Sequence, residues 1–343
     1  MRGLGLLEVE NLYVHFPFCR GKCRYCALHS APGASQAERD GYAASLAAAV
    51  DSALSQRSLK TVYFGGGTPA LCDLRPFFRV LELRIADGYE FTVELHPLDV
   101  SDSLLATLVA GGVNRISMGV QSLSSETLAD MGRGYTPDVA ARAFEMVRKH
   151  FDNAGIDLIV GYPGDMGRTS ARDLRALGEW GLSHCSAYSI QNERGLSGVP
   201  DDDAILDRLR ETAAELEGLG LVRYEISNYA VPGRECRHNL AVWRGEDYAG
   251  FGEGACGRIG LRRTRGAGTS AAVVETVTPH FDAVERRIFR LRTREGLDAE
   301  GFPHWLGALE GFRAAGLLVF SGGVWRLTPR GTEVCDSILA ELV

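Results

Sequence analysis

The sequence predicts an α/β fold, in which a partial, open-sided (β/α)6 barrel of the TIM type is followed by a small winged-helix-like α+β domain. Short β-rich runs alternate with amphipathic helical stretches through the first two-thirds of the chain. Six such pairs are too few to close an eight-stranded barrel. Residues 281–343 show a different, helix–hairpin–helix order. A chain of 343 residues has room for one barrel and one small domain.

Six strand candidates, each followed by a helical stretch, indicate a parallel sheet with right-handed crossovers. The strands are expected at residues 11–17, 61–64, 91–95, 115–120, 155–160 and 185–190. The helices are expected at residues 38–56, 101–110, 136–150, 170–180 and 201–219. Pro137, directly after Thr136, suits the first turn of a helix. A barrel of this kind places its site at the carboxyl ends of the strands.

The remainder of the chain differs in composition from the barrel. Residues 224–260 are rich in glycine and aromatic residues, and residues 262–270 are expected to form a loop or linker. Helices are then expected at 285–293, 302–315 and 329–342, with two short strands at 317–320 and 324–327. We therefore expect domains at 1–222, 223–275 and 276–343. The last domain suits docking or a lid better than DNA binding, because the chain is acidic.

Composition and charge exclude several classes of protein. The net charge of −7 argues against nonspecific binding of nucleic acid, which needs a basic face. No apolar run is long enough for a transmembrane helix, and residues 1–8 hold no apolar stretch typical of a signal peptide. Five cysteines are scattered singly, which favours a reducing cytoplasm over a disulfide framework. The oligomeric state is not indicated by the sequence.

Cys19, Cys23 and Cys26 have the spacing C-x3-C-x2-C and directly follow the first strand. Three thiolates on one loop can hold three irons of a 4Fe-4S cluster and leave the fourth iron open. An open coordination position is where a metal site can perform chemistry. The alternative is zinc, because His29 follows Cys26 by three residues and would complete a closed Cys3His site.

Polar residues and glycines follow the other strands. Residues 65–69 read Gly-Gly-Gly-Thr-Pro, a run that lets the backbone approach a ligand closely or simply forms a turn. Glu94, Gln121, Arg133 and Asp157 lie at or after the next three strands. Each alone is most simply a solvated or ion-paired residue. Together they offer acceptors for a ribose and an ammonium group, and a donor for a carboxylate.

Four segments carry a family resemblance: residues 13–19 with the cysteine motif, 64–69, 114–122 and 157–163. In this order they resemble the radical S-adenosylmethionine (SAM) enzymes of the HemN/HemW group. The resemblance favours the iron–sulfur cluster over zinc. It implies that SAM chelates the open iron and that one electron from the cluster cleaves SAM to methionine and a 5′-deoxyadenosyl radical.

The resemblance also implies roles for individual residues. Tyr13 would pack near the SAM molecule on the cluster. Gly66, Gly67 and Thr68 would meet the amino end of SAM. Its ribose and carboxylate would be surrounded by Glu94, Gln121, Arg133 and Asp157.

Two features resemble the HemW branch more than the HemN branch. Leu28 stands where coproporphyrinogen oxidases of the HemN type carry a further cysteine, and residues 224–255 match a block found in HemW-type proteins. HemW-type proteins are regarded as haem chaperones that bind one haem and pass it to an acceptor protein. His238, in a segment similar to the HNxxYW pattern, is the implied axial ligand of the haem iron.

The chain departs from that pattern at several positions. Val242 replaces the tyrosine of the HNxxYW pattern, and Cys256 stands where the family usually has histidine. Residues 27–29 and His96 also differ from the usual residues after the cluster and after the third strand. These changes leave the SAM positions intact. A true radical SAM enzyme, acting on a tetrapyrrole or transferring a methyl group with a second SAM, is the alternative function.

Overall fold

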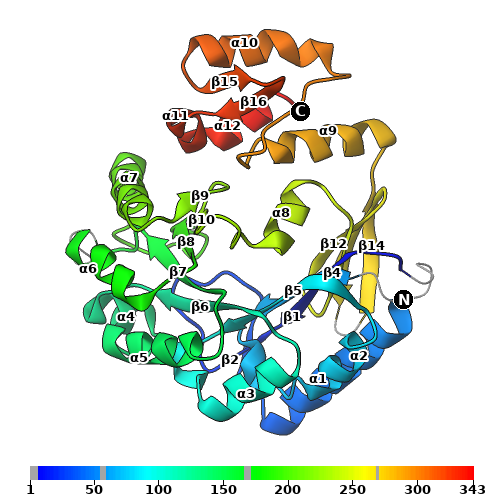
Figure 1. Cartoon of the computed structure of the whole chain (residues 1–343), viewed down its shortest axis with the longest axis vertical. Helices are drawn as coiled ribbons and strands as arrows, with labels where there is room; N and C mark the ends of the chain where they lie inside the picture. Colours follow the sequence, from blue (N-terminus) through cyan, green and yellow to red (C-terminus); the bar gives the residue numbers. More distant parts are fainter. Residues whose placement is uncertain (1–6, 55–58, 166–170, 268–269) are drawn as a thin grey trace.

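The computed structural model describes residues 7–54, 59–165, 171–267 and 270–343. Within these residues one mixed sheet of twelve strands runs in the order β14-β13-β12-β11-β1-β4-β5-β6-β7-β8-β10-β9. The sheet curves around the centre of the molecule without closing, so that β14 and β9 form its two edges (Figure 1). No helix in the described ranges is long and apolar enough to cross a membrane.

The six predicted strands are confirmed, and they lie side by side in parallel at the centre of the sheet. They are β1 (Asn11–Phe16), β4 (Leu59–Gly66), β5 (Ile85–Leu95), β6 (Arg115–Gln121), β7 (Ala154–Val160) and β8 (His184–Ser189). Since parallel neighbours end at the same edge, the segments that follow these strands gather on one side of the barrel.

Alternation along the strands separates an apolar face from a polar one. In β1, Leu12, Val14 and Phe16 are fully buried in the main apolar core beneath the helices. Tyr13 and His15, the residues between them, belong to the opposite face. The sheet therefore buries one face under helices and presents a largely polar face to the inside of the barrel.

The helices that follow the strands cover the outside of the sheet. They are α1 (Gln36–Ala53), α2 (Arg75–Leu81), α3 (Asp102–Ala110), α4 (Ser125–Met131), α5 (Pro137–Arg148), α6 (Ala171–Ala176) and α7 (Asp202–Gly218). Short 3-10 turns accompany them: η1 (Pro69–Leu71), η2 (Pro97–Asp99) and η3 (Leu177–Trp180). Pro137 begins α5, as predicted. α2 and α4 were not predicted, and residues 55–56 and 170 of the predicted helices lie outside the described ranges.

Antiparallel strands extend both edges of the parallel sheet. β11 (Tyr248–Phe251) pairs in parallel with β1 and leads to β12 (Cys256–Ile259), β13 (Arg262–Ala267) and β14 (Ser270–Thr276). At the other edge, β10 (Asn228–Ala230) and β9 (Val222–Arg223) follow β8. The predicted loop at 262–270 is therefore wrong in its described part. Residues 268–269 lie outside the described ranges, and the three-domain division stays a prediction from sequence.

Strand β13 was not predicted from the sequence, because it is rich in arginine. β13 carries Arg262, Arg263 and Arg265, so it shows no apolar alternation. The half-buried Arg263 instead pairs with Asp282 and Glu285 of a later helix. When the half-buried side chain of a strand is a paired charge, apolar residues do not recur at every second position, and the strand cannot be recognised from its pattern.

The C-terminal module, residues 279–343, follows the predicted helix–hairpin–helix order. It consists of α9 (Pro279–Arg290), η4 (Pro303–Trp305), α10 (Leu306–Ala314), the hairpin β15 (Leu318–Ser321) and β16 (Val324–Leu327), α11 (Pro329–Glu333) and α12 (Cys335–Ala340). The predicted last helix is broken at Val334, which leaves helical geometry. The module has an apolar core of its own, centred on Leu297, Trp305 and Leu309.

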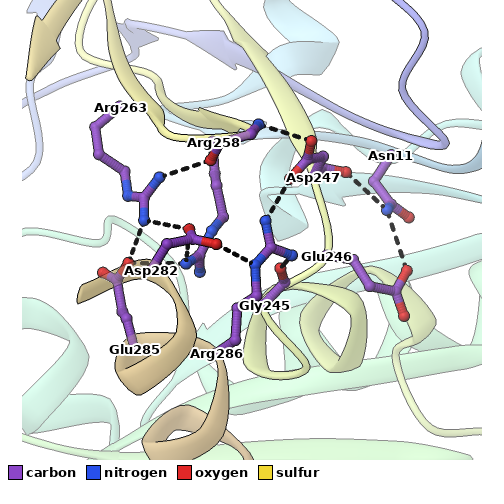
Figure 2. A network of polar contacts seen from close by, with 10 residues as sticks. Asn11, Gly245, Glu246, Asp247, Arg258, Arg263, Asp282, Glu285 and Arg286 are labelled. Atoms are coloured by element: carbon purple, nitrogen blue, oxygen red, sulfur yellow. Dashed lines mark hydrogen bonds and ion pairs between the residues drawn. The ribbon is translucent and has the colours of Figure 1, made fainter. Parts of the chain in front are cut away.

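Paired charges attach α9 to the extended sheet (Figure 2). Arg258 of β12 and Arg263 of β13 both donate to Asp282 Oδ1, at 2.8 and 2.9 Å, and Arg286 Nε donates to Asp282 Oδ2 at 2.7 Å. Burial by itself would raise the pKa of the Asp282 carboxyl, but these three guanidinium groups hold it well below its usual range. The network fixes the C-terminal module against the barrel.

Candidate functional site

A cavity of about 880 Å³ opens at the carboxyl ends of the parallel strands. We call it the barrel-mouth cavity. Its volume lies within the range of small-molecule sites. Ten of the twelve predicted site residues line it: Cys19, Cys23, Cys26, Gly66, Gly67, Thr68, Glu94, Gln121, Arg133 and Asp157. Residues more than 130 positions apart in the sequence thus share one cavity, as strand-end positions in a barrel require.

The cysteine loop forms one wall of the cavity. β2 (Phe18–Cys19) pairs with β3 (Ala31–Pro32), which closes the base of a loop that carries Cys23 and Cys26. Burial raises the pKa of the Cys19 thiol to about 11, and the neighbouring Cys26 and Cys23 add to the shift. The Arg133 guanidinium lies 3.5 Å from Cys23 Sγ. Three thiols around one cavity fit the three protein ligands of a 4Fe-4S cluster.

His29 is placed differently from the thiols. Its Nε2 lies 3.3 Å from Glu253 Oε1, in a contact in which both side chains are about half exposed. In the part of the chain that the structure describes, no group of three His, Cys, Asp or Glu side chains is arranged to hold a single metal ion. The geometry therefore gives no support to the Cys3His zinc site.

The glycine turn after β4 lies directly under the first cysteine. Gly66 has φ +104°, and a Cβ there would meet the His15 ring at 2.5 Å. A Cβ on Gly67 would lie 2.4 Å from the Phe18 carbonyl oxygen and 2.9 Å from Cys19 Sγ. Glycine is thus needed at both positions, because His15, Phe18 and Cys19 occupy the space that a side chain would fill.

Two half-buried carboxyl groups, those of Glu94 and Asp157, lie on the inner face of the barrel. Glu94 accepts a hydrogen bond from Tyr63 Oη at 2.8 Å and from the backbone N–H of Gly66 at 3.1 Å. Burial, followed by repulsion from Asp157, raises the pKa of Glu94 to about 7. Burial also raises the pKa of Asp157, against hydrogen bonds from Ser186 and Ser117. A cationic ligand would compensate both carboxylates.

The end of β6 is bent around the cavity. Gln121 has φ +71°, the left-handed region that a side chain rarely adopts, and the pairing of β6 with β7 is irregular between Gly119 and Gln121. Arg133 Nη2 and the Tyr135 hydroxyl hold this bend by donating to the Gly119 carbonyl at 2.7 and 2.9 Å. Strained backbone held in this way is typical of functional sites.

Sequence analysis missed several aromatic residues of the cavity. Tyr25, Tyr63 and Tyr188 line it. Tyr25 stands directly before the third cysteine, which was an available signal. Tyr63 shows only as one member of an apolar strand, and Tyr188 follows no motif. His96, noted only as a departure from the family, lines the cavity as well, and burial lowers its pKa to about 3.

Tyr13 and His238 lie outside the barrel-mouth cavity. His238 belongs to α8 (Arg237–Trp243), which sits inside the curve of the sheet in Figure 1, and its side chain is buried. The rings of Tyr13 and Tyr63 pack against His238, with centroids 6.3 and 5.3 Å away. The Tyr13 hydroxyl lies 3.0 Å from His15 Nδ1. Both predicted roles, contact with SAM and with haem, stay predictions.

The hydrogen bonds of His238 assign its tautomer. Asn11 donates its amide to the Asp247 carbonyl, which turns its oxygen toward Thr61. Thr61 donates its proton to that oxygen and therefore accepts from His238 Nδ1, at 2.8 Å. Burial lowers the pKa of His238 to about 3, with repulsion from Arg115 adding to the shift. The imidazole is thus neutral, with its lone pair on Nε2, the form that binds metals.

Known proteins resemble this chain in sequence and in fold. Residues 13–169 match the model of the radical SAM superfamily. The chain is 31% identical to "Heme chaperone HemW" of Mycobacterium tuberculosis, over 97% of this chain and 94% of that protein. It is 35% identical to the protein of the same name in Escherichia coli K12, over 73% of this chain and 70% of the relative.

The chain belongs to the HemW family of radical SAM proteins. Its fold is similar to that of Escherichia coli coproporphyrinogen III oxidase (HemN), a radical SAM enzyme, with a TM-score of 0.81 at 20% identity. The two folds match over 97% of this chain and 89% of HemN. The open α/β barrel with its C-terminal module is thus the fold expected from the sequence. Membership of the superfamily implies a 4Fe-4S cluster and SAM.

Proposed function

We propose that this chain is a haem chaperone that holds a 4Fe-4S cluster and SAM in the barrel-mouth cavity, binds haem and passes it to an acceptor protein. The observation that carries the proposal is similarity over nearly the whole chain to proteins named heme chaperones. It is supported by the ten predicted residues that line one cavity. Leu28, in place of a further cysteine, distinguishes the chain from coproporphyrinogen oxidases of the HemN type.

In this proposal some cavity residues hold the cluster and others bind SAM. Cys19, Cys23 and Cys26 are the protein ligands of the cluster, and Gly66 and Gly67 let the turn after β4 pack closely against the cluster loop. When bound, the cluster supplies an electron and an open iron position for SAM. The carboxylates of Glu94 and Asp157 attract the cationic and hydroxyl groups of SAM, Gln121 borders its ribose, and Arg133 donates to its carboxylate.

Haem ligation by His238 is part of the proposal and requires a change in the protein. Nε2 has the right tautomer for iron, but His238 is only 4% exposed and is covered by aromatic rings. Ligation therefore needs α8 to separate from Tyr13 and Tyr63. We further propose that the chain works in the cytoplasm, since all eight cysteines, each within the described ranges, are free thiols.

A haem titration of anaerobically reconstituted protein, followed by optical absorption, tests the function. Wild-type protein should bind one haem saturably, and His238→Ala should bind it more weakly while keeping its cluster absorbance. A wild-type protein that shows no saturable binding contradicts the chaperone function. Equal affinity in wild type and variant contradicts only the ligand assignment.

The complete set of SAM-binding positions supports a second candidate, a radical SAM enzyme acting on a tetrapyrrole or a methyltransferase using two SAM molecules. A carrier has no evident need for all of these residues. Products should be analysed under anaerobic, reducing conditions with candidate tetrapyrroles. SAM that remains intact after prolonged incubation counts against this candidate.

A further inference from the structure

A second large cavity, of about 860 Å³, lies between α7 and the C-terminal module. We call it the module cleft. Its walls come from the end of β8, α7, residues 223–227, residues 291–294 and the segment from β16 to α12. Of these, only residues 224–227 belong to a block that the sequence singles out. It nearly equals the barrel-mouth cavity in volume, so it is large enough for a sizeable organic ligand.

The lining of the cleft is rich in arginine, although the whole chain is acidic. Five arginines line it, against four acidic residues. Two of the arginines are already paired: Arg210 with Glu333, at 2.7 Å, and Arg292 with Asp336, at 2.6 Å. The other three, in the described part of the chain, form no ion pair with a carboxylate: Arg223, Arg294 and Arg326.

Arg294, which is exposed, and Arg326, which is half-buried, lie on adjoining segments of the cleft wall. Arg326 Nε donates to the Arg294 carbonyl at 2.8 Å, and the Arg294 N–H donates to the Tyr224 carbonyl at 3.0 Å. The Arg294 backbone is therefore held by residue 224 of the barrel and by the Arg326 side chain. Arg326 Nη1 also donates to the carbonyl and hydroxyl oxygens of Ser321, both at 3.2 Å. Neither arginine has a carboxylate partner, and two such arginines on adjoining segments suit a ligand with two carboxylates.

Apolar side chains form much of the remaining wall. Leu209 and Ala213 of α7 pack partly against the barrel core, and Ile226 and Leu327 pack partly against the core of the C-terminal module. All four are half-buried, so apolar surface from both cores borders the cleft. The matching ligand has an apolar body and two carboxylates.

We propose that the module cleft binds haem, with Arg294 and Arg326 pairing with its two propionates and the apolar wall covering the macrocycle. This inference rests on the proposed haem-binding function. Ser189 and Ser227 line both cavities, so a macrocycle in the cleft borders the SAM site. His238 does not line the cleft, so the assignment of the propionates and macrocycle to the cleft is independent of the iron ligand, which the His238 experiment tests.

Haem titrations of the full chain with its cluster reconstituted test this site. Arg294→Glu/Arg326→Glu should raise the Kd for haem by at least about tenfold. Arg262→Glu/Arg265→Glu is the matched control, because it changes the net charge equally on β13, outside the cleft lining. The control should keep wild-type affinity. Cluster absorbance should be unchanged in both variants, which shows that they fold.

Haem dimethyl ester, whose propionates are uncharged, provides a second probe on the wild-type protein. It should bind more weakly than haem by about the same factor, and the Arg294→Glu/Arg326→Glu variant should not weaken it further. Haem affinity that is unchanged in this variant, or wild-type protein that binds ester and haem equally, overturns the assignment while the chaperone function stands. Wild-type protein that binds no haem overturns both.

Discussion

The barrel-mouth cavity and the module cleft are nearly equal in volume but differ in how they are built. The first is formed by short motifs at the ends of consecutive parallel strands, with glycines, thiols and half-buried carboxyl groups. The second is formed by arginines and half-buried leucines, mostly from segments without a motif. The first is thus specified by backbone geometry at fixed positions. The second depends on how the C-terminal module packs against α7.

Loss of one cluster ligand should abolish binding in the barrel-mouth cavity and leave binding in the module cleft unchanged. Cys23→Ala should lose the 4Fe-4S absorbance, the bound iron and SAM binding together, because two thiolates hold such a cluster poorly. If the cavities are independent, haem affinity should remain. Iron analysis and SAM and haem titrations measure these effects, with Cys256→Ala, an exposed cysteine outside the cavity lining, as control. A Cys23→Ala protein that keeps its iron contradicts the ligand assignment.

A methyl group under the cluster loop should have almost as large an effect. Gly67→Ala places a Cβ against the Phe18 carbonyl and Cys19 Sγ, so the loop must move and iron content after reconstitution should fall by about half or more. Gly21→Ala, in the same loop but with no atom within 4 Å of the new Cβ, should retain wild-type iron. Equal iron in both variants contradicts the close packing inferred for Gly67.

The next prediction concerns the C-terminal module, which the charge network of Figure 2 attaches to the sheet. Asp282→Ala leaves Arg258, Arg263 and Arg286 without their shared partner and should destabilise the protein by about 3 kcal/mol. Thermal unfolding followed by circular dichroism measures this. Asp336→Ala, which removes a side chain that is 88% exposed, should change stability by less than about 1 kcal/mol. Similar losses in both variants contradict a special role for the network.

The network should also contribute to sensitivity to acid. The folded-state pKa of Asp282 is held below its ordinary value of 3.8. Its stabilising contribution is therefore full above that value and is lost as the pH falls below it. Asp282→Asn should unfold with a smaller pH dependence below pH 3.8 than wild type does.

Protonation of Glu94 should make SAM binding depend on pH. The pKa of Glu94 is raised to about 7, and a cationic ligand favours the carboxylate, so binding releases a proton. SAM affinity should therefore rise with pH through about 7 and fall by roughly tenfold one unit below it. Isothermal titration at several pH values measures this, and Glu94→Gln should show lower affinity and a flatter profile. An unchanged slope in Glu94→Gln assigns the dependence to another group.

The smallest expected effect concerns the strained end of β6. Gln121→Gly relieves a left-handed backbone and should change stability by no more than about 1 kcal/mol in either direction, while weakening SAM binding through loss of the side-chain amide. Thermal unfolding and SAM titration together separate the two effects. Unchanged SAM affinity would remove Gln121 from the binding site.

The sequence was sufficient to predict the six parallel strands and ten residues that line one cavity. Apolar alternation is local, and parallel strands bring their ends to one edge wherever the chain continues. Strand β13 was not predicted, because its half-buried Arg263 is not apolar and instead forms ion pairs with residues distant in the sequence. Tertiary structure alone decided that His238 is covered by Tyr13 and Tyr63, since α8 packs inside the barrel. It also decided the module cleft, because Arg294 and Arg326 become neighbours only when distant segments pack together.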